Sequence, residues 1–217
     1  APDSAGGAIE LYARGQYEAV VARLAPAFAA GQAGIQDRLL LARACLHLGR
    51  GEQAADVLES VLKTDGENPE ANSLRGQQLL AASQPTGAVK FLDRAYKLRK
   101  TPAVASLLGQ AHFQLGNRVQ AKEYLEAALA EDIRNPANSF TLGKMCLADG
   151  AGAQAEKFLL LAQDAGLESA ELHHLLGQAY LLQRKFVGPV MIRRLARPAK
   201  VGDIVDEQVV LRSIEGR

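Results

Sequence analysis

A pattern of small and apolar residues returns at a constant interval along most of this chain. Residues 108–121 read LGQAHFQLGNRVQA, and looser copies begin at position 142 (LGKMCLADGAGAQA) and at position 176 (LGQAYLLQRKF). One small residue recurs at intervals of 33 or 34, namely at Ala8, Ala42, Gly76, Gly109, Gly143 and Gly177. A chain with such a period is expected to fold as a stack of similar units, each contacting its neighbours in sequence.

Within one unit, the apolar residues have the spacing of two successive helices. In the fourth unit a first stripe contains Leu107, Leu108, Ala111 and His112, and a second runs over 121–128. Residues at such intervals lie on one side of a helix. Glycines stand between the two stripes, where a left-handed residue can end a helix, at Gly15, Gly49, Gly116 and Gly150. Prolines mark the joints between units, at Pro69, Pro102 and Pro136. Each unit is therefore predicted to be a helix–turn–helix.

Composition favours helices and excludes several classes of protein. Aromatic residues make up 5% of the 217 residues and tryptophan is absent, whereas sheets favour aromatic and β-branched residues. The 25 basic and 24 acidic residues nearly cancel, so we expect neither nucleic acid nor an anionic membrane as a partner of the whole chain. No apolar run is long enough for a membrane span. The chain is expected to be soluble. Its start, APDSAGG, fits either a mature exported protein or a trimmed chain. A location in the bacterial cytoplasm and one in the periplasm are therefore both consistent with the sequence.

These features resemble the tetratricopeptide repeat family. The fourth unit carries the resemblance with Leu108, Gly109, His112 in place of an aromatic residue, Gly116, Ala121, Leu125, Ala128 and Pro136. The resemblance covers about residues 1–188, as five full units and the first helix of a sixth, and it implies an all-α fold, an α-solenoid of stacked antiparallel helix pairs. The family's early tryptophan position is never aromatic here, and Gly7 stands where leucine is expected. Because Pro26 falls inside the second helix of the first unit, we expect that helix to kink or stop near Leu24.

No residues with the spacing of a catalytic or metal site stand out. Cys45 and Cys146 occupy the same register three units apart, which predicts two buried thiols and no disulfide. His173 and His174 are adjacent, so on a helix they face different directions and cannot chelate one ion. No nucleophile, base and orienting residue can be assembled. We therefore expect no metal, no cofactor and no enzymatic activity.

The resemblance implies a concave face lined by the first helix of each unit, here called helix A. Two series of residues on that face form the candidate partner-binding groove. The polar series is Arg43, Gln77, Gln110, Lys144 and Gln178. The apolar series, three positions further on, is Leu46, Leu80, Phe113, Leu147 and Leu181. Such a surface could hydrogen-bond an extended peptide while holding alternate side chains, or accept an amphipathic helix. The alternative is a solvated inner face whose leucines are half-buried by the neighbouring unit.

Some family members clamp a C-terminal carboxylate with lysine, asparagine and arginine on successive A helices. The corresponding positions here carry Leu39, Leu40 and Arg43, then Glu70 and Leu74, or one unit on Ala103 and Leu107. This clamp is therefore absent, and an adaptor of that kind is disfavoured.

The repeat pattern breaks after Phe186. Residues 189–217 are predicted to be extended or hairpin-like, with candidate strands at 190–195 and 209–211. Four basic residues suggest a nucleic-acid arm, but no aromatic residues are interleaved with them, so nucleic acid is disfavoured. The final Ile-Glu-Gly-Arg resembles the factor Xa recognition tetrapeptide and fits either a tag remnant or native sequence. Helix A of the sixth unit lacks a regular partner helix, so we expect the tail or a second molecule to cover its apolar surface. Deletion of residues 189–217 is then expected to raise self-association.

Two functions follow from this reading. The first is a non-enzymatic protein–protein interaction scaffold that binds a peptide or partner helix in its concave groove. The second is a structural segment of a longer repeat array in a bacterial assembly, secretion or polysaccharide-export system, acting through self-association at its C-terminal end.

Overall fold

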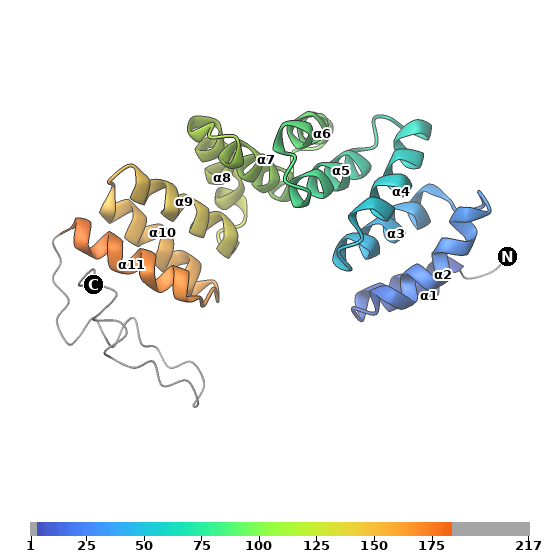
Figure 1. Cartoon of the computed structure of the whole chain (residues 1–217), viewed down its shortest axis with the longest axis horizontal. Coiled ribbons are helices and arrows are strands. Elements are labelled where there is room, and N and C mark those ends of the chain that lie inside the picture. The colour runs from blue at the N-terminus through green and yellow to red at the C-terminus, as the bar shows by residue number, and fades with distance from the viewer. Residues whose placement is uncertain (1–3, 184–217) are drawn as a thin grey trace, which may run out of the picture. The chain divides into compact units, whose positions relative to one another are not determined.

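The computed structural model describes residues 4–183, which form helices joined by short turns (Figure 1). The chain divides into two compact units, residues 1–131 and residues 132–217. The N-terminal unit contains α1 (Ser4–Ala13), α2 (Tyr17–Ala29), α3 (Ile35–His47), α4 (Gly51–Thr64), α5 (Pro69–Ala81), α6 (Pro85–Leu98), α7 (Pro102–Gln114) and α8 (Arg118–Glu131). The C-terminal unit contains α9 (Pro136–Ala148), α10 (Gly152–Asp164) and α11 (Ala170–Leu182). The predicted all-α solenoid is confirmed over the described residues. The strands predicted in the tail lie outside them.

Each A helix from the third unit onward begins at a side-chain cap. The caps are Asn68, Thr101, Asn135 and Ser169, and each side-chain oxygen accepts a hydrogen bond from the backbone N–H three positions on, at 2.9, 3.3, 3.2 and 3.1 Å respectively. Proline follows the cap at the start of α5, α7 and α9, where its missing N–H costs no helical hydrogen bond. The predicted unit joints at Pro69, Pro102 and Pro136 are thus confirmed, because cap and proline together specify where the helix starts.

The turns between the helices of a pair depend on a left-handed residue. Gly15, Gly49, Gly116 and Gly150 have φ of 73°, 71°, 77° and 72°, as the sequence predicted. In the third pair the same place is taken by Ser83, whose φ is 57°. A side chain with a Cβ is strained in this region, at a cost of roughly 1–2 kcal/mol. The backbone of the turn is therefore the same in all five pairs, and at Ser83 it is imposed on a residue that does not favour it.

Helix α2 does not stop near Leu24, so that part of the expectation was wrong. It continues through Pro26 to Ala29. Proline removes only one donor here, the N–H that would bond the carbonyl of Ala22, and Ala22 is exposed. Water can hydrate that carbonyl, and the buried Val20 and Leu24 hold the helix on α1 and α3.

The two helices of a pair approach closely at the recurring small residue. A Cβ added at Gly109 would lie 2.5 Å from Leu125 Cγ, and one at Gly143 would lie 2.6 Å from Leu159 Cγ. Gly76 has the same relation to Leu92. These three leucines are completely buried. The glycine is therefore needed for the leucine of the second helix (helix B) to pack against the backbone of helix A.

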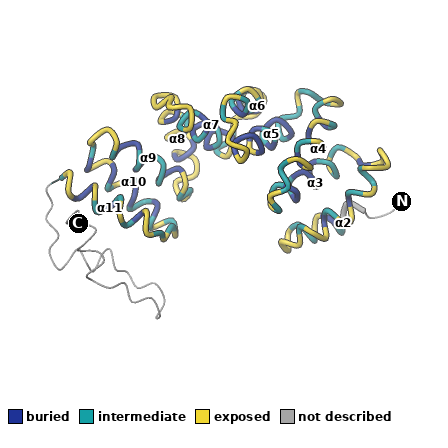
Figure 2. The backbone as a smooth tube through the Cα atoms, viewed as in Figure 1, coloured by how far each residue is buried: buried dark blue, intermediate teal, exposed yellow. Residues whose placement is uncertain are grey.

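Successive pairs stack through both of their helices. In the N-terminal unit each A helix contacts the next, α1 with α3, α3 with α5 and α5 with α7. The B helices α2, α4 and α6 contact the A helix that follows them. In the C-terminal unit α9 likewise contacts α11, and α10 contacts α11. Figure 2 shows buried residues on the helix sides that face one another, and exposed residues at many of the turns. Contact between successive A helices places them on the inner side of each unit.

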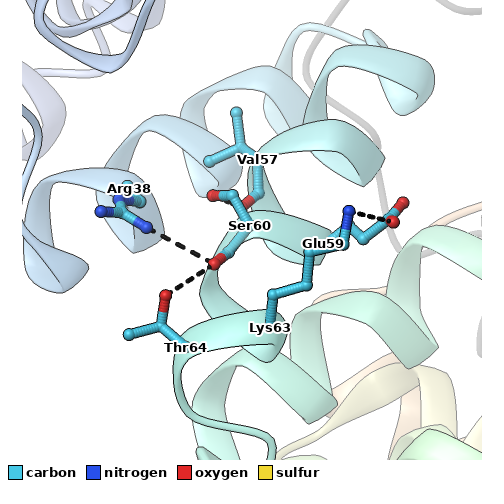
Figure 3. Close-up of polar contacts among 6 residues, drawn as sticks. All are labelled: Arg38, Val57, Glu59, Ser60, Lys63 and Thr64. Carbon is cyan, nitrogen blue, oxygen red and sulfur yellow. Dashed lines mark hydrogen bonds and ion pairs between the residues drawn. The ribbon is translucent and has the colours of Figure 1, made fainter. Parts of the chain in front are cut away.

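Polar contacts reinforce the packing of α3 against α4. The Ser60 carbonyl accepts hydrogen bonds from the Arg38 guanidinium at 3.4 Å and from the Thr64 hydroxyl at 3.1 Å (Figure 3). Arg38 Nε also donates to the Ala33 carbonyl at 2.8 Å. On α4 the ammonium of Lys63 lies 2.9 Å from the Glu59 carboxylate, and the hydrogen bond from Lys63 lowers the pKa of the Glu59 carboxyl. The bond from Arg38 to Ser60 ties α3 to α4, and the bond from Arg38 to Ala33 ties the first turn of α3 to the residues before it.

We predict that a bulky residue at Ala121 disrupts the fourth pair. Ala121 is fully buried on α8, whereas the adjacent Gln120 is exposed. Ala121→Phe should overpack the contact between helices and lower the free energy of unfolding by about 1–3 kcal/mol. Gln120→Phe is the matched control and should change it by less than about 0.5 kcal/mol. Urea unfolding followed by circular dichroism measures both, and equal effects would refute the assigned register.

A second prediction concerns the strained turn at Ser83. Ser83→Gly should stabilise the protein by about 1 kcal/mol, because glycine adopts a positive φ without a Cβ clash. The reverse change in the equivalent turn, Gly116→Ser, should destabilise it by a similar amount. Midpoints of urea unfolding for the two variants should therefore shift in opposite directions. A loss of stability in Ser83→Gly would show that the serine side chain contributes something else to this turn.

Candidate functional site

The polar and apolar series predicted for the groove lie on successive A helices. In the N-terminal unit Arg43 and Leu46 come from α3, Gln77 and Leu80 from α5, and Gln110 and Phe113 from α7. Gln77 is exposed, and Arg43, Leu46, Gln110 and Phe113 are half-buried. Leu80 is only 9% exposed and belongs to a core cluster with α6 and α7, so it offers little surface to a partner. Gln110 donates to the Ser106 hydroxyl on its own helix at 3.2 Å.

Three of these residues line a pocket in the N-terminal unit. The pocket has a volume of about 240 Å³ and is lined by Tyr12, Arg43, Leu46, His47, Leu74 and Gln77. These side chains come from α1, α3 and α5. Leu46 and Leu74 supply apolar surface, while the phenol, guanidinium, imidazole and amide groups supply polar surface. This pocket, formed by three consecutive A helices, is the candidate site.

An aromatic cluster forms one part of the pocket wall. The imidazole of His47 stacks on the Tyr17 ring with centroids 4.3 Å apart and an interplanar angle of 4°. Its Nε2 is hydrogen-bonded to the Tyr12 hydroxyl at 2.9 Å, and the Tyr12 ring packs edge-on against Tyr17 at 5.2 Å. Three helices, α1, α2 and α3, contribute one ring each. The cluster fixes the orientation of Tyr12 and His47 before any ligand is bound.

The protonation of Tyr12 follows from its surroundings. Burial raises the pKa of Tyr12 above its ordinary value of 10.0. The charge of Arg43 lowers this pKa, whereas Tyr17 and Glu70 raise it further. The phenol therefore keeps its proton throughout the neutral pH range. It is available to the pocket as a hydroxyl group and carries no charge there.

The cation of the pocket is paired across two A helices. Arg43 lies 2.6 Å from Glu70, and the two side chains are 41% and 27% exposed. Glu70 stands in the first turn of α5, where a carboxylate is favoured by the helix dipole. An acidic ligand would have to compete with Glu70 for Arg43, so the pocket favours a ligand with neutral hydrogen-bonding groups and apolar side chains.

The C-terminal unit contains the same kind of ion pair. Lys144 on α9 lies 2.8 Å from Glu171 in the first turn of α11, and its ammonium lies over the Phe140 ring at 5.5 Å from the centroid. The Arg43–Glu70 and Lys144–Glu171 pairs have the same separation in sequence. The cationic members of the polar series therefore bind the next A helix, and they are not unpaired contacts awaiting a ligand.

The remaining predicted residues lie on α9 and α11. Leu147 is half-buried against the core of this unit, whereas Leu181 is 50% exposed. Gln178 is exposed, and its amide is hydrogen-bonded to His174 Nε2 at 2.9 Å. Of the ten predicted residues, Arg43, Leu46 and Gln77 line the pocket and the other seven do not.

Sequence reasoning missed Tyr12, His47 and Leu74. Tyr12 stands one repeat length before Leu46, so the apolar series extends one unit further toward the N-terminus than predicted. That periodicity could have identified it. No comparable signal existed for His47, because its position in the pocket depends on stacking with Tyr17 of another helix.

The described residues offer little basis for a catalytic or metal centre. Between residues 4 and 183 no three histidine, cysteine or acidic side chains are grouped to hold a metal ion. Cys45 and Cys146 are buried, as predicted, and neither takes part in a disulfide bond. Burial raises the pKa of the Cys45 thiol, which disfavours the reactive thiolate. His173 and His174 have different partners, Gln163 and Gln178. None of the helices described here has the length and apolar character needed to cross a bilayer.

Comparison with known proteins identifies the repeats. Two tetratricopeptide repeat family models match the chain, one at residues 11–77 and the other at residues 104–132. No curated protein matches by sequence.

Solved structures of repeat proteins share the fold. The type IV pilus biogenesis factor PilW is 16% identical over 96% of each chain, with a TM-score of 0.78. PilF of Pseudomonas aeruginosa is 19% identical over 87% of this chain and 83% of its own, with a TM-score of 0.73. YrrB, described as a TPR protein with an unusual peptide-binding site, is 14% identical over 88% of this chain and 97% of its own, with a TM-score of 0.66. The two family matches show that the chain carries tetratricopeptide repeats at residues 11–77 and 104–132, and the solved structures share its fold.

Proposed function

We propose that this protein is a non-enzymatic interaction scaffold whose N-terminal unit binds a peptide segment of a partner protein on its inner face. The observation that carries the proposal is the pocket lined by Tyr12, Arg43, Leu46, His47, Leu74 and Gln77. Its lining sets two leucines beside four polar side chains, so it can contact an apolar side chain and hydrogen-bond the peptide backbone next to it. At about 240 Å³ it is sized for one or two side chains and is too small for a large cofactor.

The pocket suits an extended peptide better than a highly charged ligand. Leu46 and Leu74 would receive an apolar side chain, while Gln77 and the Tyr12 hydroxyl would exchange hydrogen bonds with the backbone beside it. Arg43 and Glu70 present a neutralised pair, so neither sign of charge on the ligand is strongly favoured. A partner helix on the same surface would have to place one apolar side chain at the same point.

The second candidate is a structural segment of a bacterial assembly, acting through self-association. Its support is that PilW, a factor in type IV pilus biogenesis, matches over 96% of both chains. Sedimentation velocity distinguishes the candidates, because a structural segment should form concentration-dependent oligomers without any added partner, whereas the scaffold requires a different protein.

We predict that Gln77→Trp blocks ligand binding. Peptides would be selected from a phage-displayed library of random linear sequences, and one labelled peptide would be titrated by fluorescence anisotropy. The indole at this exposed position should obstruct the pocket and weaken binding at least about tenfold, or ~1.4 kcal/mol. Gln53→Trp is the matched control, since Gln53 is also exposed but lies on α4 away from the lining residues.

Two results would contradict the proposal. One is that the library yields no peptide that binds the protein. The other is that both tryptophan variants bind the selected peptide as tightly as the original protein does. Circular dichroism of the two variants should remain unchanged, because neither replaced side chain is buried.

A further inference from the structure

His47 is an exposed aromatic side chain that two neighbouring rings hold in place. Tyr17 lies parallel to its imidazole at 4.3 Å, and Tyr12 lies edge-on to it at 5.7 Å, both measured between ring centroids. His47 remains exposed in spite of these contacts. It lines the pocket of the N-terminal unit, whereas Tyr17 does not. The imidazole therefore presents to the pocket a surface that Tyr17 leaves uncovered.

The orientation of this imidazole is set before a ligand arrives. His47 is the last residue of α3, and an exposed side chain at a helix end ordinarily samples several rotamers. Here the parallel stack on Tyr17 and the 2.9 Å hydrogen bond to the Tyr12 hydroxyl favour one orientation. A ligand that contacts His47 does not have to order it, and this lowers the entropic cost of binding.

We propose that the peptide side chain received by the pocket is aromatic and stacks on His47. This inference rests on the proposed function and specifies the anchor residue of the ligand. Aromatic rings that stack with an offset or meet edge to face attract one another beyond the effect of the area they bury. A ring on His47 would extend the stack that His47 already forms with Tyr17. Leu46 and Leu74 supply apolar surface in the same pocket.

The charges at the pocket favour an aromatic anchor over a basic or an acidic one. Arg43 lines the pocket, so a lysine or arginine of the ligand would meet a like charge. An acidic side chain would compete with Glu70, which lies 2.6 Å from Arg43. A neutral ring has neither disadvantage, and its face attracts guanidinium groups. An aliphatic side chain can also contact Leu46 and Leu74, but it gains no stacking on His47.

A second stack in the N-terminal unit provides a matched control. His112 on α7 lies parallel to Tyr124 on α8, with ring centroids 5.6 Å apart and an interplanar angle of 6°. His112 is half-buried and does not line the pocket. His112→Leu therefore makes the same change as His47→Leu in a comparable pair of rings, but outside the proposed binding site.

Three phage-displayed libraries test the class of the anchor residue. Each library displays linear peptides with random flanks around one fixed residue, which is phenylalanine, leucine or arginine. Selection on the full chain should give binders mainly from the phenylalanine library. One labelled binder is then compared with the same peptide carrying leucine at the fixed position. Fluorescence anisotropy should show that the leucine peptide binds about threefold to tenfold more weakly, the usual size of an aromatic pair.

Variants of the protein test whether His47 is the source of this preference. The ratio of the two dissociation constants should fall to about one in His47→Leu and should also fall in Tyr17→Leu, because the imidazole loses its support. Tyr17→Phe keeps a ring beneath His47 and should keep the ratio, as should His112→Leu. Both peptides are titrated against the same preparation, so the ratio does not depend on how much of a variant is folded.

The outcomes separate this inference from the function on which it rests. Tighter binders from the leucine or arginine library would overturn the aromatic anchor and leave peptide binding intact. An undiminished preference for phenylalanine in His47→Leu would equally show that the ring does not stack on His47. Failure of all three libraries to give a binder would contradict the proposed function, and this inference with it.

Discussion

The contact between a small residue of helix A and a leucine of helix B is the interaction on which the rest of this structure depends. It recurs at nearly the same place in every pair, and the leucines Leu24, Leu58, Leu92, Leu125 and Leu159 are at most 1% exposed. Complete burial of a leucine contributes about 1.5–3 kcal/mol. Where the small residue is glycine, the leucine reaches the backbone of helix A. This close approach sets the geometry of each pair and therefore of the surface that the pair offers to its neighbour.

The inner surface follows from the way the pairs stack. Because successive A helices contact one another, polar side chains on their inner side can pair with the neighbouring A helix. Such side chains form ion pairs between helices as well as contacts with a ligand. Arg43–Glu70 and Lys144–Glu171 have the same spacing in sequence, and each joins one A helix to the first turn of the next. Exposed pairs of this kind add little stability on their own. Their main effect is to fix which polar groups remain available, and in the N-terminal unit these include the Gln77 amide and the Tyr12 hydroxyl.

Much of the fold was predictable because each position of the repeat recurs in several units, so its residue type can be compared between units. The glycine turns, the proline starts and the buried cysteines all appear where the period placed them. The expectation that Pro26 would stop α2 near Leu24 was wrong, because the carbonyl that loses its donor belongs to Ala22, which is exposed to water. Ser83 shows the opposite effect, since packing of the third pair imposes a left-handed turn on a residue that carries no sequence signal for one.

The sequence by itself determined the helix pairs and their register, because these depend on periodicity and on residue size. Only the tertiary structure decided which residues of the A helices form a site. Leu80 is buried in the core, and Arg43 is paired with Glu70. Tyr12 and His47 are hydrogen-bonded to each other, and His47 stacks on Tyr17. Those outcomes depend on distances between side chains from different helices, and a linear pattern of residue types does not contain such distances.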